Sequence, residues 1–244
     1  MTDENSTLNA MTDILEQAGQ QIILPAYHSL IHASTKADGS VVTETDLASQ
    51  RFIQHALEQL NRTIAFLGEE MTETEQSACL QQSGGRYWCL DPLDGTSNFT
   101  AHFPGFAISL ALIENGMVQL ACIHDPVRCE TFSAIRSQGA CMNGQPVRAS
   151  DQNRVQNTVG FIDFKRLSTP LVVKLATQPV YRSQRNIGSC ALEWAWLAAG
   201  RGHFIIHGGE KIWDFAAGSL IAEEAGCTVG DFTGKPLFPG KSLS

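Results

Sequence analysis

One run in the first half of the chain constrains the fold most: residues 88–99 read Trp-Cys-Leu-Asp-Pro-Leu-Asp-Gly-Thr-Ser-Asn-Phe. Its apolar approach, 87–90, predicts a buried strand, so Asp91 and Asp94 would emerge at the carboxyl end, where open α/β sheets bind ligands. Pro92 cannot donate to a sheet ladder and fixes the turn. The run therefore predicts an α/β fold with two acidic side chains at one edge of a sheet.

The same run combines groups that suit a divalent cation with groups that suit a phosphate. Asp91 and Asp94 would repel each other, and both would be costly to desolvate, unless a cation lay between them. Gly95 lets the backbone approach a ligand closely, and the hydroxyl and N–H of Thr96 can face a phosphoryl oxygen. The alternative is an Asx-rich surface turn, which Asp-Pro and Asp-Gly steps often form.

Three further stretches place acidic residues at the ends of predicted elements. Glu69 and Glu70 follow the short apolar run 64–67, which indicates another strand. Asp46 lies at the start of one helical pattern, and Asp214 lies at the start of another. Either aspartate alone could be a helix N-cap. Acidic residues at four element ends together favour a metal site.

These motifs resemble those of the inositol monophosphatase family, within the fructose-1,6-bisphosphatase-like phosphatases. The family carries, in this order, Thr-x-x-Asp, Gly-Glu-Glu, Trp-x-x-Asp-Pro-x-Asp-Gly-Thr-x-Asn-Phe and Trp-Asp-x-Ala-Ala-Gly. In this chain the motifs are residues 43–46, 68–70, 88–99 and 213–218. The resemblance implies a Mg²⁺-dependent, Li⁺-sensitive phosphomonoesterase, an α-β-α-β-α sandwich and a homodimer.

The resemblance also implies the role of each matching residue. Thr96 would orient the attacking water and pass its proton toward Asp46, with Glu69 as the other catalytic group. Backbone N–H groups of Gly95 and Thr96 would hold the phosphate, and Glu70 would support the ligands without binding metal. No covalent phospho-enzyme is implied. The oxygen donors that would hold two or three Mg²⁺ ions are Glu69, Asp91, the Leu93 carbonyl, Asp94 and Asp214.

The substrate pocket is less well defined by the motifs. Asn98 and Phe99 resemble the inositol and sugar-phosphate branch, whereas the nucleotide 3'-phosphatase branch tends to carry Lys-Glu there. Gly188 and Ser189, at a predicted helix start, would line the pocket with Asp94; an ordinary serine N-cap is the alternative reading. The match at Asn98 and Phe99 favours a small polyol or sugar monophosphate as the substrate.

The loop before Asp214 departs from the family pattern. By spacing, the glutamate that binds inositol hydroxyls in the family falls at His207, and the loop reads His-Gly-Gly-Glu-Lys. Glu210 could replace that glutamate if the loop follows another path. Lys211 would suit a second anionic group, or would be a solvent-facing charge. Lys36, in a glycine-bearing loop, is a further candidate for the site.

The chain is expected to form two halves around the site, 1–146 with most metal ligands and 147–244 completing it. A long amphipathic helix comes first, and later segments predict an antiparallel meander followed by alternating helices and strands. The expected ranges are a helix over 8–27, meander strands over 106–114, 117–124 and 130–135, strands near 160–163, 184–187 and 203–206, and helices near 168–177, 189–199 and 212–226.

Composition excludes some functions and leaves others open. A net charge of −8 at pH 7 disfavours nucleic-acid binding, which would need a basic stripe. No apolar run approaches the roughly 18 residues of a membrane helix. A cytoplasmic protein is therefore expected, and seven cysteines without a Cys-x-x-Cys pair agree with a reducing compartment. The alternatives are a 3'(2'),5'-bisphosphate nucleotidase, a fructose-1,6-bisphosphatase-type enzyme, or a catalytically silent interaction protein on the same fold.

Overall fold

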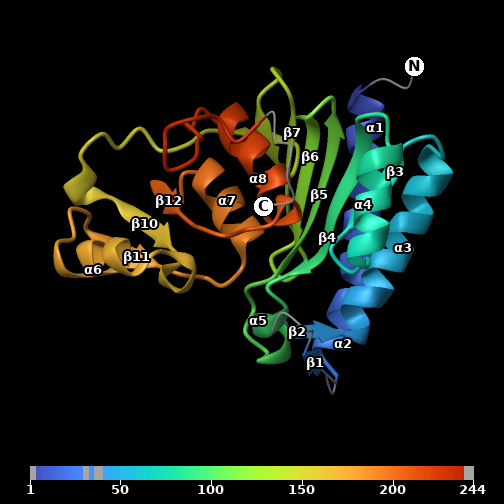
Figure 1. Ribbon diagram of the computed structural model, residues 1–244, viewed down its shortest axis with the longest axis horizontal. Coiled ribbons are helices and arrows are strands. Elements are labelled where there is room, and N and C mark those ends of the chain that lie inside the picture. Colours follow the sequence, from blue (N-terminus) through green and yellow to red (C-terminus); the bar gives the residue numbers. More distant parts are fainter. Residues whose placement is uncertain (1–3, 30–32, 36–40, 239–244) are drawn as a thin grey trace.

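The computed structural model describes residues 4–29, 33–35 and 41–238, so Lys36 lies outside the described residues. The elements form a layered α+β fold: helices, a large sheet, two central helices, a small sheet and an outer helix (Figure 1). Among the described residues, no helix is long and apolar enough to span a membrane. The layered arrangement agrees with the sandwich expected from the sequence.

The large sheet has seven strands in the order β3-β4-β5-β6-β7-β8-β9. β3 and β4 are parallel, and every later pair is antiparallel, which confirms the predicted meander. Nearly every residue of β4 and β5 is buried, because helices cover both faces of the sheet. The strands are β3 (Ala65–Gly68), β4 (Arg86–Asp94), β5 (Ala107–Glu114), β6 (Met117–Asp125), β7 (Glu130–Ile135), β8 (Ala140–Met142) and β9 (Gln145–Val147).

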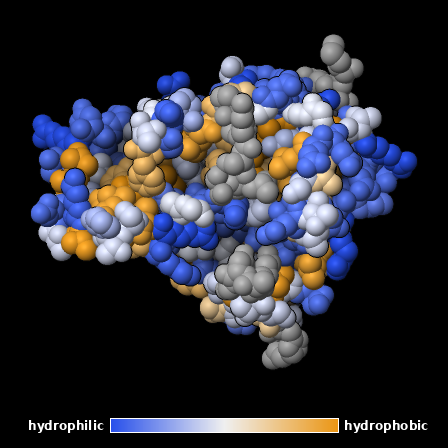
Figure 2. Space-filling model, viewed as in Figure 1, coloured by the Kyte–Doolittle hydropathy of each residue, from blue (hydrophilic) through white to orange (hydrophobic). Residues whose placement is uncertain are grey.

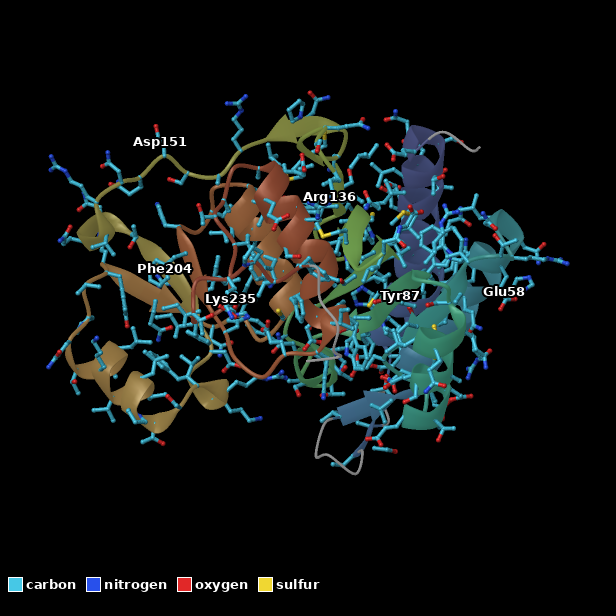
Figure 3. All side chains as sticks on the ribbon, turned by 45° about the horizontal axis from the view of Figure 1, so that its top comes forward. Glu58, Tyr87, Arg136, Asp151, Phe204 and Lys235 are labelled. Carbon is cyan, nitrogen blue, oxygen red and sulfur yellow. The ribbon has the colours of Figure 1, made fainter. Side chains whose placement is uncertain are left out.

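One face of the large sheet is covered by α1 (Glu4–Ala18) and α3 (Glu44–Leu60). The predicted helix over 8–27 is interrupted by a π-helical turn, Gly19–Ile23, before α2 (Leu24–Tyr27). A Cβ at Gly19 would lie 2.8 Å from Nε2 of His124, so this turn approaches β6 more closely than an alanine could. Glu58 points outward from α3, whereas Tyr87 lies in the interior (Figure 3).

The chain between β3 and β4 forms α4 (Glu73–Gln82), which the sequence analysis did not predict. This helix is polar and packs at the edge of the sheet, with Gln76 as its buried residue. Its start is a capping box in which the Thr72 hydroxyl accepts from the N–H of Glu75. The apolar pattern of this helix is too weak to predict it, but the capping box at its start was a usable signal.

The opposite face is covered by α7 (Cys190–Ala198) and α8 (Ile212–Glu224). Both helices are apolar nearly all round, because they lie between the large and the small sheet (Figure 1). Gly218 of α8 allows a close crossing, since a Cβ there would lie 2.3 Å from Cβ of Trp194. Both helices were predicted from the sequence.

The small sheet is parallel, in the order β11-β10-β12, and α6 (Thr169–Thr177) lies outside it. Its strands are β10 (Val159–Ile162), β11 (Ser183–Arg185) and β12 (Phe204–Ile206), each overlapping its predicted range. Apolar residues gather on this side of the surface (Figure 2), where Val173 and Val180 are exposed. The remaining elements are β1 (Ala33–Thr35), β2 (Val41–Thr43), α5 (Thr96–Thr100) and the 3-10 turns Val155–Asn157 and Phe164–Arg166.

Candidate active site

The candidate site begins at the carboxyl end of β4. We expected the strand to end before Pro92, but β4 continues to Asp94 with a shift of register between Asp91 and Asp94. Pro92 lies within this irregular stretch, where the regular ladder is interrupted and a missing N–H costs little. Asp91 is buried, and its Oδ1 accepts the N–H of Leu93 at 3.0 Å.

Gly95 turns the chain from β4 into α5. Its φ is +92°, and a Cβ there would lie 2.8 Å from the carbonyl oxygen of Gly105, so glycine is required for both reasons. The next hydroxyl, Thr96 Oγ1, donates to Oδ1 of Asp46 at 2.9 Å and lies 3.1 Å from the carbonyl oxygen of Leu93. The structure thus brings together the predicted pair of Thr96 and Asp46.

Asp46 also serves the helix to which it belongs. Its Oδ2 accepts the N–H and the hydroxyl of Thr43, at 2.8 and 2.5 Å, in the capping box of α3. Asp46 can therefore cap α3 and hold the Thr96 hydroxyl at the same time, because each carboxylate oxygen has its own partners. Burial raises the pKa of Asp46 despite these hydrogen bonds.

Asp94 connects the end of β4 to the start of α7. Its Oδ2 accepts from Ser189 Oγ at 2.5 Å and from the N–H of Ala191 at 2.7 Å. Ser189 is also the N-cap of α7, since its Oγ accepts the N–H of Leu192 at 3.3 Å. Gly188 precedes it with a φ of +81°.

The acidic side chains affect one another's protonation. Burial raises the pKa of Asp91 well above its usual range, and the nearby Glu69 and Asp94 carboxylates raise it further. Burial raises the pKa of Asp94 to about 6. Burial, together with the Asp94 carboxylate, raises the pKa of Asp214 to about 8. Hard oxygen donors that repel one another in this way fit a divalent cation such as Mg²⁺, which would remove the repulsion.

Asp214 reaches this cluster from the first turn of α8. Its Oδ2 accepts the N–H of Lys211 at 2.8 Å and lies 3.7 Å from a guanidinium nitrogen of Arg166. Lys211 itself is exposed. Arg166, which was not among the predicted residues, follows β10 in a 3-10 turn and lines a cavity of about 100 Å³ beside Asp94 and Asp214.

The loop after β12 packs His207 between two carboxylates. Nε2 of His207 is 2.5 Å from Oε2 of Glu193, and Nδ1 pairs with Oε1 of Glu210. Burial opposes the charge on this ring, but the two carboxylates outweigh it and raise the pKa of His207 to about 10. Glu193 was not among the predicted residues, although a single glutamate in the apolar run of α7 was the available signal.

The other predicted residues lie around the same region. The N–H of Glu69 donates to the carbonyl of Leu90 at 3.1 Å, which places Glu69 beside the end of β4. The N–H of Glu70 donates to Oε1 of Gln50 on α3 at 3.0 Å. Asn98, predicted only as a marker of substrate class, donates through Nδ2 to the carbonyl oxygens of Gly105 and Ile187, at 2.6 and 2.7 Å.

The fold defines a layered α+β protein in which a cluster of carboxylates gathers where the end of β4 meets the first turns of α7 and α8. A model of the inositol monophosphatase family matches residues 4–243, and the chain belongs to this family. The family is metal-dependent, and membership supports a phosphatase activity.

The chain is similar both to a protein named as a phosphatase and to proteins named as a Nus factor. The chain is similar to a fructose-1,6-bisphosphatase/inositol-1-monophosphatase of Thermotoga maritima, at 36% identity over 80% of this chain and 73% of the relative. It is also similar to the Nus factor SuhB of Escherichia coli, at 36% identity over 84% of this chain and 76% of the relative. A solved IMPase structure from Thermotoga maritima superimposes with a TM-score of 0.84 at 31% identity, covering 94% of this chain and 87% of that one.

Proposed function

We propose that the protein is a Mg²⁺-dependent phosphomonoesterase that hydrolyses a small polyol or sugar phosphate by direct attack of water. The observation that carries this proposal is the Thr96–Asp46 hydrogen bond of 2.9 Å beside the buried carboxylate of Asp91 and the half-buried carboxylate of Asp94. A hydroxyl held by a buried carboxylate, next to a cation site, is an arrangement that can orient and deprotonate a water molecule.

The proposed metal ligands are oxygen atoms from both parts of the chain. When bound, two or three Mg²⁺ ions would polarise the phosphoryl oxygens and neutralise the leaving alkoxide. Residues 1–146 would contribute most of these ligands and 147–244 would complete the site through α8. The ligands are Glu69, Asp91, the Leu93 carbonyl, Asp94 and Asp214.

Thr96 would orient the attacking water. Its hydroxyl donates to Asp46 or to the Leu93 carbonyl, so its oxygen lone pairs remain available to accept a hydrogen bond from that water. Burial raises the pKa of Asp46, which makes this carboxylate a better proton acceptor than an exposed one. The N–H groups of Gly95 and Thr96, at the positive-φ turn into α5, would hold the phosphate.

A bisphosphate is the second candidate substrate, and Arg166 is the observation that favours it. Its guanidinium lines the cavity that also borders Asp94, His207 and Asp214, and could bind a second phosphate in a bidentate manner. His207 replaces the glutamate expected for inositol hydroxyls, and its ring is engaged by Glu193 and Glu210. A preference for a second anionic group over an inositol ring would follow.

A phosphate-release panel tests both candidates. Inositol 1-phosphate, fructose 1,6-bisphosphate, 3'-phosphoadenosine 5'-phosphate and histidinol phosphate would be compared with Mg²⁺ and with a chelator. We expect Mg²⁺-dependent release that Li⁺ inhibits, greatest with a sugar or polyol phosphate. No release above the chelator control from any of the four compounds would overturn the proposal. Sedimentation of the same preparation tests the homodimer.

A further inference from the structure

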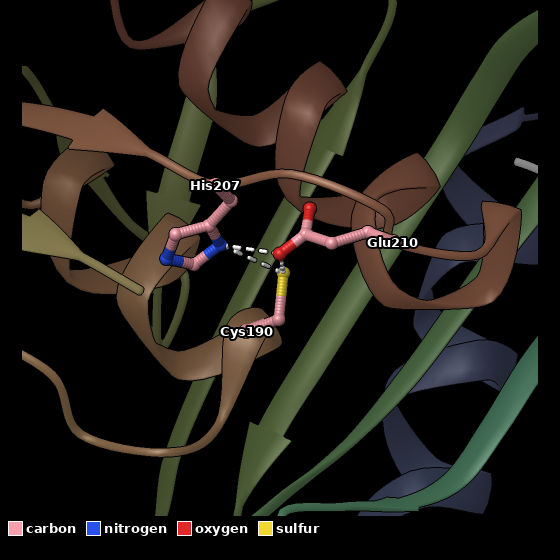
Figure 4. A group of neighbouring side chains, drawn as sticks. All are labelled: Cys190, His207 and Glu210. Carbon is pink, nitrogen blue, oxygen red and sulfur yellow. Dashed lines mark hydrogen bonds and ion pairs between the residues drawn. The ribbon is translucent and has the colours of Figure 1, made fainter. Parts of the chain in front are cut away.

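Three potential metal ligands meet beside the acidic cluster but are not part of it. Cys190 opens α7, His207 follows β12 and Glu210 precedes α8, and their ligand atoms point toward one another (Figure 4). Cys190 Sγ lies 3.5 Å from Nδ1 of His207 and 2.9 Å from Oε1 of Glu210. The side chains of His207 and Glu210 are only 6% and 12% exposed.

The donor set differs in kind from that of the acidic cluster. Sulfur, imidazole nitrogen and one carboxylate oxygen are the ligands of Zn²⁺, whereas Mg²⁺ prefers oxygen alone. With Zn–S near 2.3 Å and Zn–N near 2.0 Å, tetrahedral geometry separates the sulfur from the nitrogen by about 3.5 Å. The Cys190–His207 distance already has this value. Only the Glu210 carboxylate would have to move outward, by less than about 1 Å.

His207 is held in the orientation that such a site needs. Its Nε2 lies 2.5 Å from Oε2 of Glu193, whose side chain is 2% exposed. Oε1 of Glu193 accepts the backbone N–H of Ile187, which fixes the carboxylate in turn. A carboxylate on the far nitrogen orients a zinc-binding histidine. The near nitrogen, which faces Glu210 and Cys190, would bind the ion in place of its proton.

The surroundings carry an excess of negative charge. Arg166 is the one permanently charged cation among the described residues that line the cavity. A divalent ion would therefore be attracted to it. The acidic side chains that line the same cavity are Asp94, Asp163, Glu193, Glu210 and Asp214.

We propose that Cys190, His207 and Glu210 form a three-ligand site for Zn²⁺, with Glu193 as the positioning residue of His207. Three protein ligands leave one tetrahedral position open, and the cavity shared with Asp94 gives a water or an oxygen of a small-molecule ligand access to it. This site shares its cavity with Asp94 and Asp214 but uses neither of these proposed Mg²⁺ ligands, and its existence does not depend on the phosphatase activity.

Co²⁺ in place of Zn²⁺ gives a direct readout, because only a thiolate-bound ion shows a sulfur-to-cobalt charge-transfer band. The full chain would be titrated with Co²⁺ in excess Mg²⁺, and Zn²⁺ would then displace the bound ion. We expect one equivalent with the band in wild type and loss of the band in Cys190→Ser. Cys227→Ser is the matched control, because both cysteines pack against the cluster around Trp194. It should keep the band.

Two further variants test the positioning role of Glu193 and distinguish this site from Co²⁺ binding at the acidic cluster. Glu193→Gln should keep the band but bind Co²⁺ roughly 10- to 100-fold more weakly, as expected when a carboxylate that orients a histidine ligand is lost. Asp91→Asn should keep both the band and the affinity, whatever happens to its activity. The proposal is overturned by an absent band in wild type, by a band that survives Cys190→Ser, or by one that disappears with Asp91→Asn. If Cys190→Ser does not fold, X-ray absorption of the wild-type zinc protein must show a sulfur neighbour.

Discussion

Replacing Thr96 by alanine tests the proposed chemistry most directly. The change removes Oγ1, which donates to Asp46 at 2.9 Å, but it keeps the backbone N–H proposed to hold the phosphate. Positioned proton transfer contributes about 10²- to 10⁴-fold to a rate. We therefore expect kcat to fall at least about 100-fold, equivalent to roughly 2.7 kcal/mol of barrier, while KM changes only a few-fold.

The fold should tolerate this substitution. Asp46 keeps its two bonds from Thr43, so one of its oxygens remains satisfied and the capping box of α3 is preserved. Loss of the single bond to Oδ1 should lower the free energy of unfolding by about 1–3 kcal/mol, measurable by urea titration. Thr96→Ser is the matched control, because it keeps the hydroxyl and should keep most of kcat.

Steady-state phosphate release with the best substrate of the panel, at saturating Mg²⁺, is the assay. A kcat for Thr96→Ala equal to that of wild type would show that Thr96 is only a turn residue. A rise in KM with kcat unchanged would assign the hydroxyl to uniform binding rather than to the transition state. Either result refutes the proposed role.

Asp91→Asn should leave less than about a tenth of the Mg²⁺-dependent activity, a loss of more than about 1.4 kcal/mol, in a protein with unchanged circular dichroism; higher residual activity would remove Asp91 from the ligand set. Arg166→Ala should lower the ratio of kcat/KM for fructose 1,6-bisphosphate to that for inositol 1-phosphate at least about tenfold, since a charged hydrogen bond contributes about 1.5–3 kcal/mol. Lys211→Ala, at an exposed position, should change this ratio less. Equal effects of the two substitutions would contradict the proposal that Arg166 binds a second phosphate. Because burial raises the folded-state pKa of Asp94 to about 6 and of Asp214 to about 8, their protonated forms stabilise the metal-free fold, and this stability is lost as the pH rises from about 4 to 8. Urea midpoints should therefore show a stabilisation by Mg²⁺ that grows from pH 5 to pH 8, and a stabilisation independent of pH would argue against cation binding by these two groups.

Most of the scaffold could be predicted from local patterns. The meander strands and α8 were found because turn signals separate long apolar runs. These runs are apolar because the elements are buried nearly throughout. The π-helical turn at Gly19–Ile23 could not be found, because no local pattern marks it; Gly19 lies there against His124, a residue far along the chain. The extension of β4 past Pro92 likewise depends on its pairing with β5.

The site was predictable to the extent that its residues lie at element ends. The spacing of acidic residues indicated a cation site, and the family resemblance supplied the pairing of Thr96 with Asp46, which are 50 positions apart in sequence and joined only by the fold. The cluster around His207 could not be predicted, because it needs the end of β12 to meet the interior of α7. A lone charge in an apolar helix marked Glu193 but gave no information about its partner.

The double role of Ser189 ties the acidic site to the local stability of a central helix. Its Oγ donates to Asp94 and accepts the N–H of Leu192, so the first turn of α7 cannot fray without releasing a proposed cation ligand. Amide hydrogen exchange at Leu192 therefore measures the opening of the site in the native protein, without substrate or turnover. A cation held through Asp94 would slow that exchange in proportion to its occupancy, which makes one backbone amide a reporter of ion affinity.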